Sequence, residues 1–238
     1  YASVMAALFL LAVSGGAAFM ARGVAKSALA MEPHQRYFAA STASPRIYDE
    51  GCHADIFVVD LSDCAFGNTA SPETVVLFGD SHAAQWFPAL LKIAKREGWR
   101  LVSLTKSGCP SMAYTTFLRM LDRTYFECDE WRKNAFAWIE KTRPMLTIVS
   151  NSSRHTITKT GGLDEAGWRD ATRRTMAALS GKSTATVVLK DTPWPPFNTP
   201  ICLSRAAWRN MDTRRRCEFD PRSGTSKAIA EIETSALS

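Results

Sequence analysis

The sequence VVLFGDSHAA occupies residues 75–84 and changes its pattern abruptly. It begins with four apolar residues, two of them β-branched, which is typical of a short buried strand. Gly79 and Asp80 interrupt this run, and from Ala83 onward the apolar residues follow the spacing of a helix. These helical positions are Trp86, Phe87, Leu90, Leu91 and Ala94. The stretch therefore predicts a strand, a tight turn and a helix in direct succession.

Ser81 lies at the turn between the predicted strand and the predicted helix. A hydroxyl at such a turn stands clear of the sheet edge, and N–H groups at the start of the helix can receive a developing oxyanion. Open α/β sheets place their chemistry at turns of this kind. We therefore take Ser81 as the candidate nucleophile. The alternative is that Ser81 is an ordinary helix N-cap.

Several short motifs resemble the SGNH hydrolase family. The first is GDSHA at residues 79–83, which continues as QWFPAL at residues 85–90. The others are KSGCP at residues 106–110 and DTP at residues 191–193, followed by Cys202. Together these motifs are most similar to the SGNH domain fused to membrane acyltransferase family three, whose members modify bacterial surface polysaccharides. The resemblance covers residues 50–205.

Strands and helices alternate along the rest of the chain. Further strands are predicted at residues 101–104, 145–149 and 184–189, and further helices at residues 128–141, 163–179 and 227–237. This alternation predicts a doubly wound, mainly parallel sheet with helices on both faces. Together with the resemblance, it gives the expected fold class: a three-layer α/β/α sandwich, SGNH- or flavodoxin-like, preceded by one transmembrane helix.

The resemblance implies roles for residues near Ser81. In the family, an oxyanion hole is built from the nucleophile's own turn, a glycine N–H and an asparagine side chain. These roles fall on Ser81, Gly108 and Asn151. Supporting positions come from the same turn: Gly79, Asp80 and His82. On local sequence alone, the alternative for Gly108 is a simple turn glycine. For Asn151 the local sequence favours a loop-capping residue, because the family's Gly-x-Asn-Asp context is missing.

A serine nucleophile needs a base to take its proton. The family supplies an acid and a base from an Asp-x-x-His block, and the 238 residues contain no such block. We therefore expect a piece of a longer protein that is inactive by itself. His82 is a poor substitute, because neighbouring side chains on a helix point apart. His155 can approach the same sheet edge, although a loop histidine is usually exposed.

The sequence predicts three regions. Residues 1–21 carry no charge and are long enough for a transmembrane helix, with a signal peptide as the rival interpretation. Residues 22–70 are predicted as a linker with a disulfide-bridged loop, in which His53 is expected at the surface. Residues 71–238 are predicted as the SGNH-like domain, incomplete at its C-terminal end.

Six cysteines occur as near neighbours in the chain: Cys52 with Cys64, Cys109 with Cys128, and Cys202 with Cys217. Three local disulfides are the simplest account, although six cysteines allow about fifteen pairings. Disulfides indicate an oxidising compartment outside the cytoplasm. The cysteines lack CxxC spacing and the histidines are scattered, so neither a metal site nor a cofactor is predicted.

The chain has 29 basic and 23 acidic residues, a net charge of +6. This charge is too mild and too dispersed to indicate a nucleic-acid partner. The densest basic run, residues 205–216, is expected to be a solvated surface, with contact to an anionic glycan or a lipid headgroup as the alternative.

The resemblance implies the extracytoplasmic domain of a cell-membrane O-acyltransferase. A serine-type acyltransferase would move acyl groups, with acetyl expected, onto cell-surface polysaccharide through Ser81, whereas an esterase with the same serine would remove them. The implied partners are a membrane acyltransferase domain, an acyl donor, a glycan acceptor, and the lipid bilayer through residues 1–21. One alternative is a non-catalytic module that binds a glycan or a partner. Another is a metallophosphoesterase-like enzyme with Asp80 and His82 as metal ligands, although its Gly-Asn-His block is absent.

Overall fold

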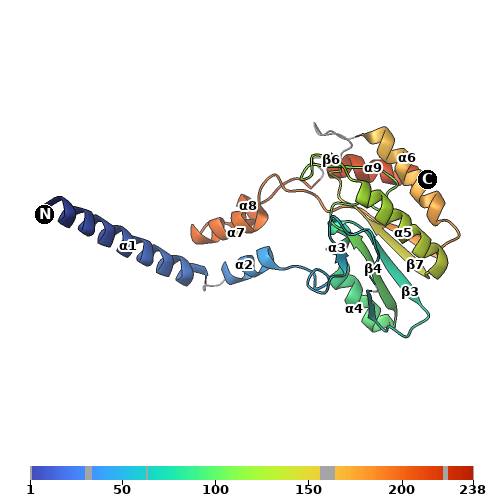
Figure 1. The fold of residues 1–238 in the computed structure, drawn as a ribbon, viewed down its shortest axis with the longest axis horizontal. Coiled ribbons are helices and arrows are strands. Elements are labelled where there is room, and N and C mark those ends of the chain that lie inside the picture. The colour runs from blue at the N-terminus through green and yellow to red at the C-terminus, as the bar shows by residue number, and fades with distance from the viewer. Residues whose placement is uncertain (1, 30–33, 63, 156–163, 222–224, 238) are drawn as a thin grey trace. The chain divides into compact units, whose positions relative to one another are not determined.

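The computed structural model describes residues 2–29, 34–62, 64–155, 164–221 and 225–237 (Figure 1). Tyr1 of the predicted membrane span and Leu163 of a predicted helix lie outside this description. The chain divides into two compact units, each of which is described by itself. One comprises residues 44–194 and 221–238, and the other residues 1–43 and 195–220.

The larger unit is built on a mainly parallel sheet with the strand order β1-β4-β3-β7-β8, in which β2 pairs antiparallel with β4. The strands are β1 (His53–Ala54), β2 (Ala65–Gly67), β3 (Thr74–Gly79), β4 (Arg100–Lys106), β7 (Leu146–Ser150) and β8 (Ala185–Leu189). A separate small hairpin pairs β5 (Phe117–Leu118) with β6 (Arg123–Thr124). The order β4-β3-β7-β8 is the flavodoxin-like, doubly wound order. The predicted α/β fold with a mainly parallel sheet is confirmed.

Helices cover both faces of this sheet (Figure 1). One face carries α3 (Ser81–Ala84) and α4 (Phe87–Glu97), and the other carries α5 (Phe126–Thr142), α6 (Glu165–Leu179) and α9 (Thr225–Leu237). Successive strand residues point to opposite faces, so β3 feeds two cores. Val75 and Leu77 pack with residues of α3 and α4, whereas Val76 and Phe78 pack with residues of α5. Because β3 is buried on both faces, its residues 75–78 form a continuous apolar run.

The smaller unit is helical. It contains α1 (Ala2–Leu29), α2 (His34–Thr42), α7 (Thr199–Trp208) and α8 (Thr213–Arg216), and α2 packs against α7. Residues 2–21 of the predicted helix form part of α1. Among the helices of the described residues, however, none combines the length and the apolar character needed to cross a membrane. The predicted membrane span is therefore not confirmed.

Residues 22–70, predicted as a linker, contain the end of α1, α2, β1 and β2. The two strands are only two and three residues long, too short to produce a recognisable alternation. The expectation that His53 lies at the surface is wrong, because its exposed fraction is 8%. It lies in β1, which pairs with β4, and its ring nitrogens contact the hydroxyls of Thr105 and Ser107 at 3.0 and 3.1 Å.

The three local disulfides are confirmed: Cys52–Cys64, Cys109–Cys128 and Cys202–Cys217. The first two belong to the larger unit and the third to the smaller one. Each bridge closes a loop of 12 to 19 residues, so each restricts the unfolded chain by about 3 kcal/mol in the chain-entropy view.

Candidate active site

The candidate site lies where the order of the strands reverses. From β3 the chain moves to β4 on one side, and it then crosses to β7 on the other side of β3. At such a switch point, the loops at the carboxyl ends of the strands diverge and leave room for a ligand. Gly79 of β3 pairs with Thr105 of β4 and with Ser150 of β7. The strand ends that precede Ser81, Gly108 and Asn151 therefore lie side by side at one edge of the sheet.

Gly79 is required at the end of β3. Its φ of +152° is a conformation that side-chain-bearing residues rarely adopt, and a Cβ atom there would lie 1.9 Å from the carbonyl oxygen of Ser150. The absence of a side chain lets the β3 turn pass directly over the end of β7. Gly79 thereby determines where the next residues, Asp80 and Ser81, leave the sheet.

Ser81 is exposed and is the first residue of α3, as the strand-turn-helix prediction requires. The alternative interpretation of Ser81 as the helix N-cap is wrong, because the N-cap is Asp80. The Oδ1 atom of Asp80 accepts a hydrogen bond from the backbone N–H of His82 at 2.7 Å. Since Asp80 caps the helix, the Ser81 hydroxyl is not needed for that purpose.

Asp80 also joins the β3 turn to the loop after β7. Its carboxylate is 1% exposed, and its Oδ2 atom accepts hydrogen bonds from the backbone N–H of Ser152 at 2.8 Å and from Nε2 of His155 at 2.6 Å. The sequence suggested an exposed loop position for His155, but its side chain is only 10% exposed. The ring of His155 lies parallel to that of Trp168 in α6, with centroids 5.9 Å apart. His155 therefore buttresses the turn that carries Ser81.

His82 forms a second histidine–carboxylate pair, with Asp191 after β8. Its Nδ1 atom lies 2.5 Å from Oδ1 of Asp191. Burial works to lower the pKa of His82, but the hydrogen bond and charge of Asp191 outweigh burial and raise this pKa. Burial likewise disfavours ionised Asp191, but hydrogen bonds from His82 and Ser153 outweigh it and lower the pKa of Asp191. Both shifts favour the charged pair.

The Asp191 carboxylate connects the loop after β7 to the loop after β8. Its Oδ2 atom accepts hydrogen bonds from the backbone N–H and hydroxyl of Ser153, both at 2.8 Å, and from Nε1 of Trp194 at 3.0 Å. The indole ring of Trp194 stacks on His82 with centroids 4.9 Å apart, and the guanidinium of Arg154 lies 3.8 Å from the centroid of the same ring. Asp191 of the DTP motif and Trp194, which follows the motif, thus hold His82 in one orientation.

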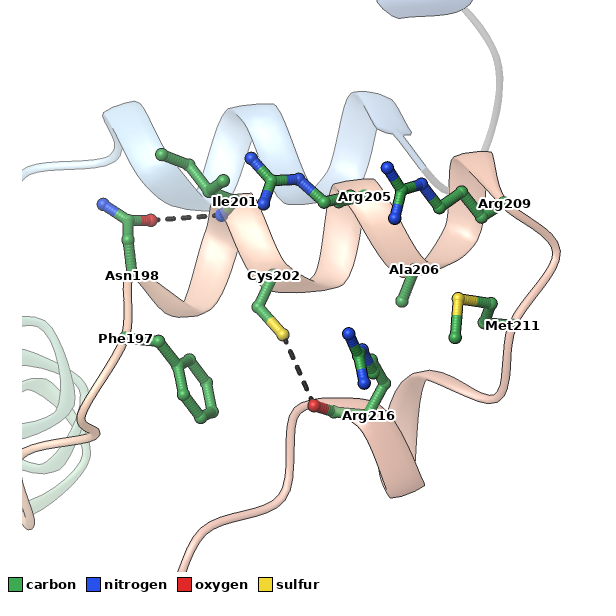
Figure 2. Close-up of a pocket in the computed structure, with 9 residues that line it drawn as sticks. All are labelled: Phe197, Asn198, Ile201, Cys202, Arg205, Ala206, Arg209, Met211 and Arg216. Atoms are coloured by element: carbon green, nitrogen blue, oxygen red, sulfur yellow. Dashed lines mark hydrogen bonds between the residues drawn. The ribbon is translucent and has the colours of Figure 1, made fainter.

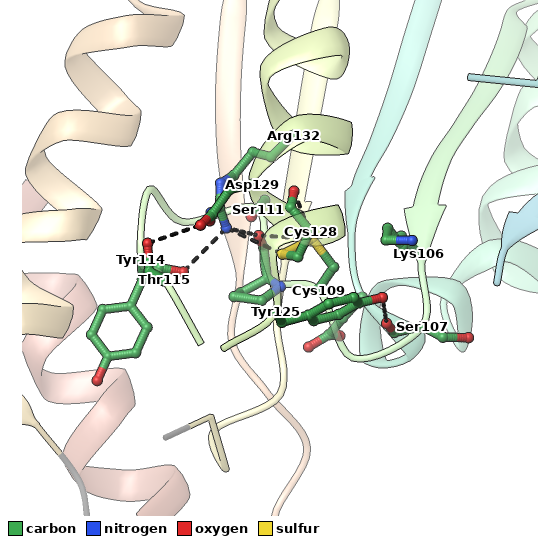
Figure 3. Close-up of a disulfide and its surroundings, with 12 residues drawn as sticks. Lys106, Ser107, Cys109, Ser111, Tyr114, Thr115, Tyr125, Cys128, Asp129 and Arg132 are labelled. Atoms are coloured by element: carbon green, nitrogen blue, oxygen red, sulfur yellow. Dashed lines mark hydrogen bonds and ion pairs between the residues drawn. A yellow bond between two sulfur atoms is a disulfide. The ribbon is translucent and has the colours of Figure 1, made fainter. Parts of the chain in front are cut away.

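Gly108 lies in a loop that several contacts immobilise. Its φ of +62° is left-handed, which favours glycine. The Tyr125 hydroxyl donates a hydrogen bond to the carbonyl of Ser107 at 2.9 Å, and the Cys109–Cys128 disulfide ties the other side of Gly108 to α5 (Figure 3). The backbone N–H of Gly108 therefore belongs to a fixed segment beside the candidate nucleophile's strand.

Lys106, at the end of β4, is a buried anchor that the sequence reasoning did not single out. Its ammonium donates to the carbonyls of Asp55, Ile56 and Val58 at 2.6 to 2.8 Å. Burial lowers the pKa of Lys106 to about 8. The available signal was a lysine two residues after the predicted apolar strand 101–104, where a buried charge without partners would be costly.

Asn151 is buried, with an exposed fraction of 3%. Its Oδ1 atom accepts hydrogen bonds from the backbone N–H and the hydroxyl of Ser111, at 2.7 and 2.8 Å. Its Nδ2 atom has no acceptor among the described residues. A buried donor without an acceptor is unfavourable by about 1–3 kcal/mol, so such a group is often kept for a ligand.

A parallel α/β/α sheet of this order, with a Gly-Asp-Ser turn at its switch point, defines the class of SGNH-like α/β domains. The chain belongs to the family described as the SGNH domain fused to AT3 domains, whose model matches residues 51–235. The fold is similar to that of the periplasmic domain of a lipopolysaccharide acetyltransferase from Salmonella ser. Paratyphi A. The TM-score is 0.54 at 18% identity, over 82% of this chain and 75% of that one. Comparison with curated protein sequences finds no match.

Proposed function

We propose that this chain is the extracytoplasmic domain of a membrane O-acyltransferase and that it transfers an acyl group through Ser81. The observation that carries the proposal is the position of Ser81. It is exposed at the strand-to-helix turn, while its neighbours Gly79 and Asp80 are held by close contacts to the loop after β7. Family membership and the acetyltransferase neighbour support the esterase or acyltransferase class.

In the proposed reaction, the Ser81 Oγ atom attacks the carbonyl carbon of an acyl donor. A bond forms between Oγ and the acyl group, the bond between the acyl group and the donor's leaving group breaks, and the serine proton passes through a base to that leaving group. The oxygen of a glycan hydroxyl then attacks the acyl group: a new ester bond forms, the bond to Oγ of Ser81 breaks, and the hydroxyl proton returns through the base to Ser81. If water takes the place of the glycan hydroxyl as the acceptor, the same site acts as an esterase.

The oxyanion formed in each step needs donors that are already in place. We assign this role to the backbone N–H groups of Ser81 and Gly108 and to Nδ2 of Asn151. The fixed loop around Gly108 and the buried Nδ2 atom without an acceptor among the described residues support this assignment. His82 and Asp80 are assigned as positioning residues, because each is hydrogen-bonded across the turn.

The proposed partners follow from the family description, which places such domains in fusion with AT3 domains. An AT3 domain would supply the acyl group from the membrane, and a cell-surface polysaccharide would accept it. A location outside the cytoplasm agrees with the three disulfides. Acetyl is the proposed acyl group, and residues 1–21 are proposed as the membrane-proximal segment.

The test is the Ser81→Ala variant, produced together with its AT3 domain in cells, with glycan acylation measured by mass spectrometry. We expect acylation to fall by at least about a thousandfold, because removing a serine nucleophile has effects of that size or larger. Ser180→Ala is the matched control, since Ser180 is exposed at the far end of α6. Normal acylation by Ser81→Ala would exclude the serine mechanism and favour a non-catalytic binding module.

A further inference from the structure

A cavity of about 350 Å³ lies in the helical hairpin formed by α7 and α8 (Figure 2). All of its lining residues come from residues 197–216, within the smaller unit. The Cys202–Cys217 disulfide closes this hairpin and joins α7 to the residue after α8. The cavity is therefore part of a covalently restrained segment.

Three arginines line the cavity. Arg205 extends from α7, Arg209 is the C-cap residue of that helix, and Arg216 extends from α8 into the space between the helices (Figure 2). Within the part of the chain that the structure describes, none of the three forms an ion pair with a carboxylate. Residues 197–217 contain five arginines and one acidic residue, Asp212. Asp212 caps α8 by accepting hydrogen bonds from the backbone N–H groups of Arg214 and Arg215, and its single negative charge offsets only one of the five positive charges.

Apart from Asn198, the rest of the lining is apolar and comes mainly from Phe197, Ile201 and Met211. Ile201 is 54% exposed and Met211 is 42% exposed, and Trp208 on the same hairpin is 58% exposed. Exposed tryptophan and aliphatic side chains beside arginines are typical of segments that contact the interface of a membrane. The hairpin thus combines three arginines with apolar lining side chains, which we call the apolar floor of the cavity.

We infer that the α7–α8 hairpin binds the phosphate headgroup of an anionic phospholipid. Guanidinium groups pair with phosphate oxygens through two parallel hydrogen bonds, which a lysine cannot do. The apolar floor would contact the glycerol and the first methylenes of the lipid, which a free phosphate lacks. This inference rests on the hairpin alone and does not depend on the chemistry of Ser81.

The probe is dihexanoyl phosphatidylglycerol, titrated by calorimetry into the 238-residue chain in an uncharged maltoside detergent. Dihexanoyl phosphatidylcholine serves as the reference for partition into the detergent, and inorganic phosphate tests whether the headgroup alone is sufficient. We expect saturable binding of the anionic lipid. Dihexanoyl phosphatidylcholine and inorganic phosphate should each bind about tenfold more weakly, because each lacks the equivalent of one charged hydrogen bond or of the apolar contact.

The decisive comparison is between two double variants of equal charge. Arg205→Gln/Arg209→Gln removes two cavity arginines, whereas Arg214→Gln/Arg215→Gln removes two arginines of the same hairpin that do not line the cavity. We expect the first pair to weaken lipid binding by about tenfold or more and the second by less than about twofold. Equal losses would show a diffuse charge effect and overturn the inference, as would an absence of saturable binding.

A third variant tests the inference if Arg205→Gln/Arg209→Gln does not fold. Met211→Gln keeps every arginine and changes only the apolar floor. We expect it to weaken binding of the lipid while leaving binding of inorganic phosphate unchanged. If inorganic phosphate binds the unaltered chain as tightly as the lipid does, the cavity is a phosphate site and the lipid assignment is wrong.

Discussion

The Nδ1 atom of His82 lies 2.5 Å from the Oδ1 atom of Asp191, although 109 residues separate them in the chain. His82 follows the proposed nucleophile, and Asp191 lies in the loop after β8. Burial alone would make His82 harder to protonate, so its raised pKa depends on Asp191. This pair connects the turn after β3 to the loop beyond β8.

We predict that Asp191→Asn lowers the pKa of His82 below 6.5, the ordinary value for histidine. The substitution removes the opposing charge and leaves the burial, which favours neutral imidazole. Titration of the His82 ring signals by NMR measures the change. Asp170→Asn is the control, because Asp170 is exposed on α6 and pairs with Arg174. An unchanged pKa of His82 in Asp191→Asn would contradict the assigned pairing.

The same pair predicts a window of pH in which it stabilises the fold. Its contribution needs ionised Asp191, whose pKa is lowered, and protonated His82, whose pKa is raised. It is therefore lost as the pH falls through the folded pKa of Asp191 and also as the pH rises through the folded pKa of His82. Denaturant unfolding at several pH values provides the test. The difference in the free energy of unfolding between wild type and Asp191→Asn should become smaller outside this window.

Asn151 offers a way to separate a structural from a catalytic role. Asn151→Asp keeps an acceptor for the N–H and hydroxyl of Ser111 but removes the Nδ2 donor. We predict that acylation falls by at least about a hundredfold, because one oxyanion donor is lost and a negative charge takes its place, while the amount of folded protein in the cells is retained. Asn151→Ala removes both functions and should also destabilise the fold. Full activity in Asn151→Asp would remove Asn151 from the oxyanion hole.

Gly79→Ala should be strongly destabilising. The new methyl group would lie 1.9 Å from the carbonyl oxygen of Ser150, which is backbone and cannot move aside without disturbing β7. We expect a loss of more than about 3 kcal/mol in the free energy of unfolding. Gly181→Ala is the control, because Gly181 has a φ of +70° but no atom within 4 Å of its added Cβ. It should lose only about 1 kcal/mol, from backbone strain alone. Similar losses in both variants would refute the contact argument.

Glu233 in α9 is expected to make stability depend on pH. Burial raises its pKa from 4.5 to about 7, although its Oε1 atom accepts a hydrogen bond from Nε1 of Trp168 at 3.3 Å. Because the folded state holds this proton more tightly than the unfolded chain, the contribution is present below pH 4.5 and is lost as the pH rises to about 7. The loss should be about 3 kcal/mol over that interval.

Glu233→Gln should flatten this dependence, because a glutamine does not titrate. Chemical unfolding measured from pH 4 to pH 8 provides the test. Glu231→Gln is the control on the same helix, since Glu231 is exposed. If the free energy of unfolding changes with pH by the same amount in wild type and in Glu233→Gln, Glu233 is already ionised in the folded state.

Local pattern was enough to predict the strand-turn-helix over residues 75–84, the alternation of further strands and helices, and the neighbouring cysteine pairs. Each of these follows from interactions between residues close in sequence: period-two and helical spacing, a glycine break, and short loops. The resemblance to the SGNH family, which membership confirms, rested on motifs of the same local kind.

The partners of the site residues could not be predicted in this way. Asp80 binds His155, His82 binds Asp191, and Lys106 binds three carbonyls about fifty residues earlier. These contacts form because the pairing of β1 with β4, of β3 with β7 and of β7 with β8 brings the loops to one edge of the sheet. A buried carboxylate or ammonium requires a partner, but its sequence neighbours do not say which one. Which loops meet is determined by strand order, and strand order is a property of the whole sheet.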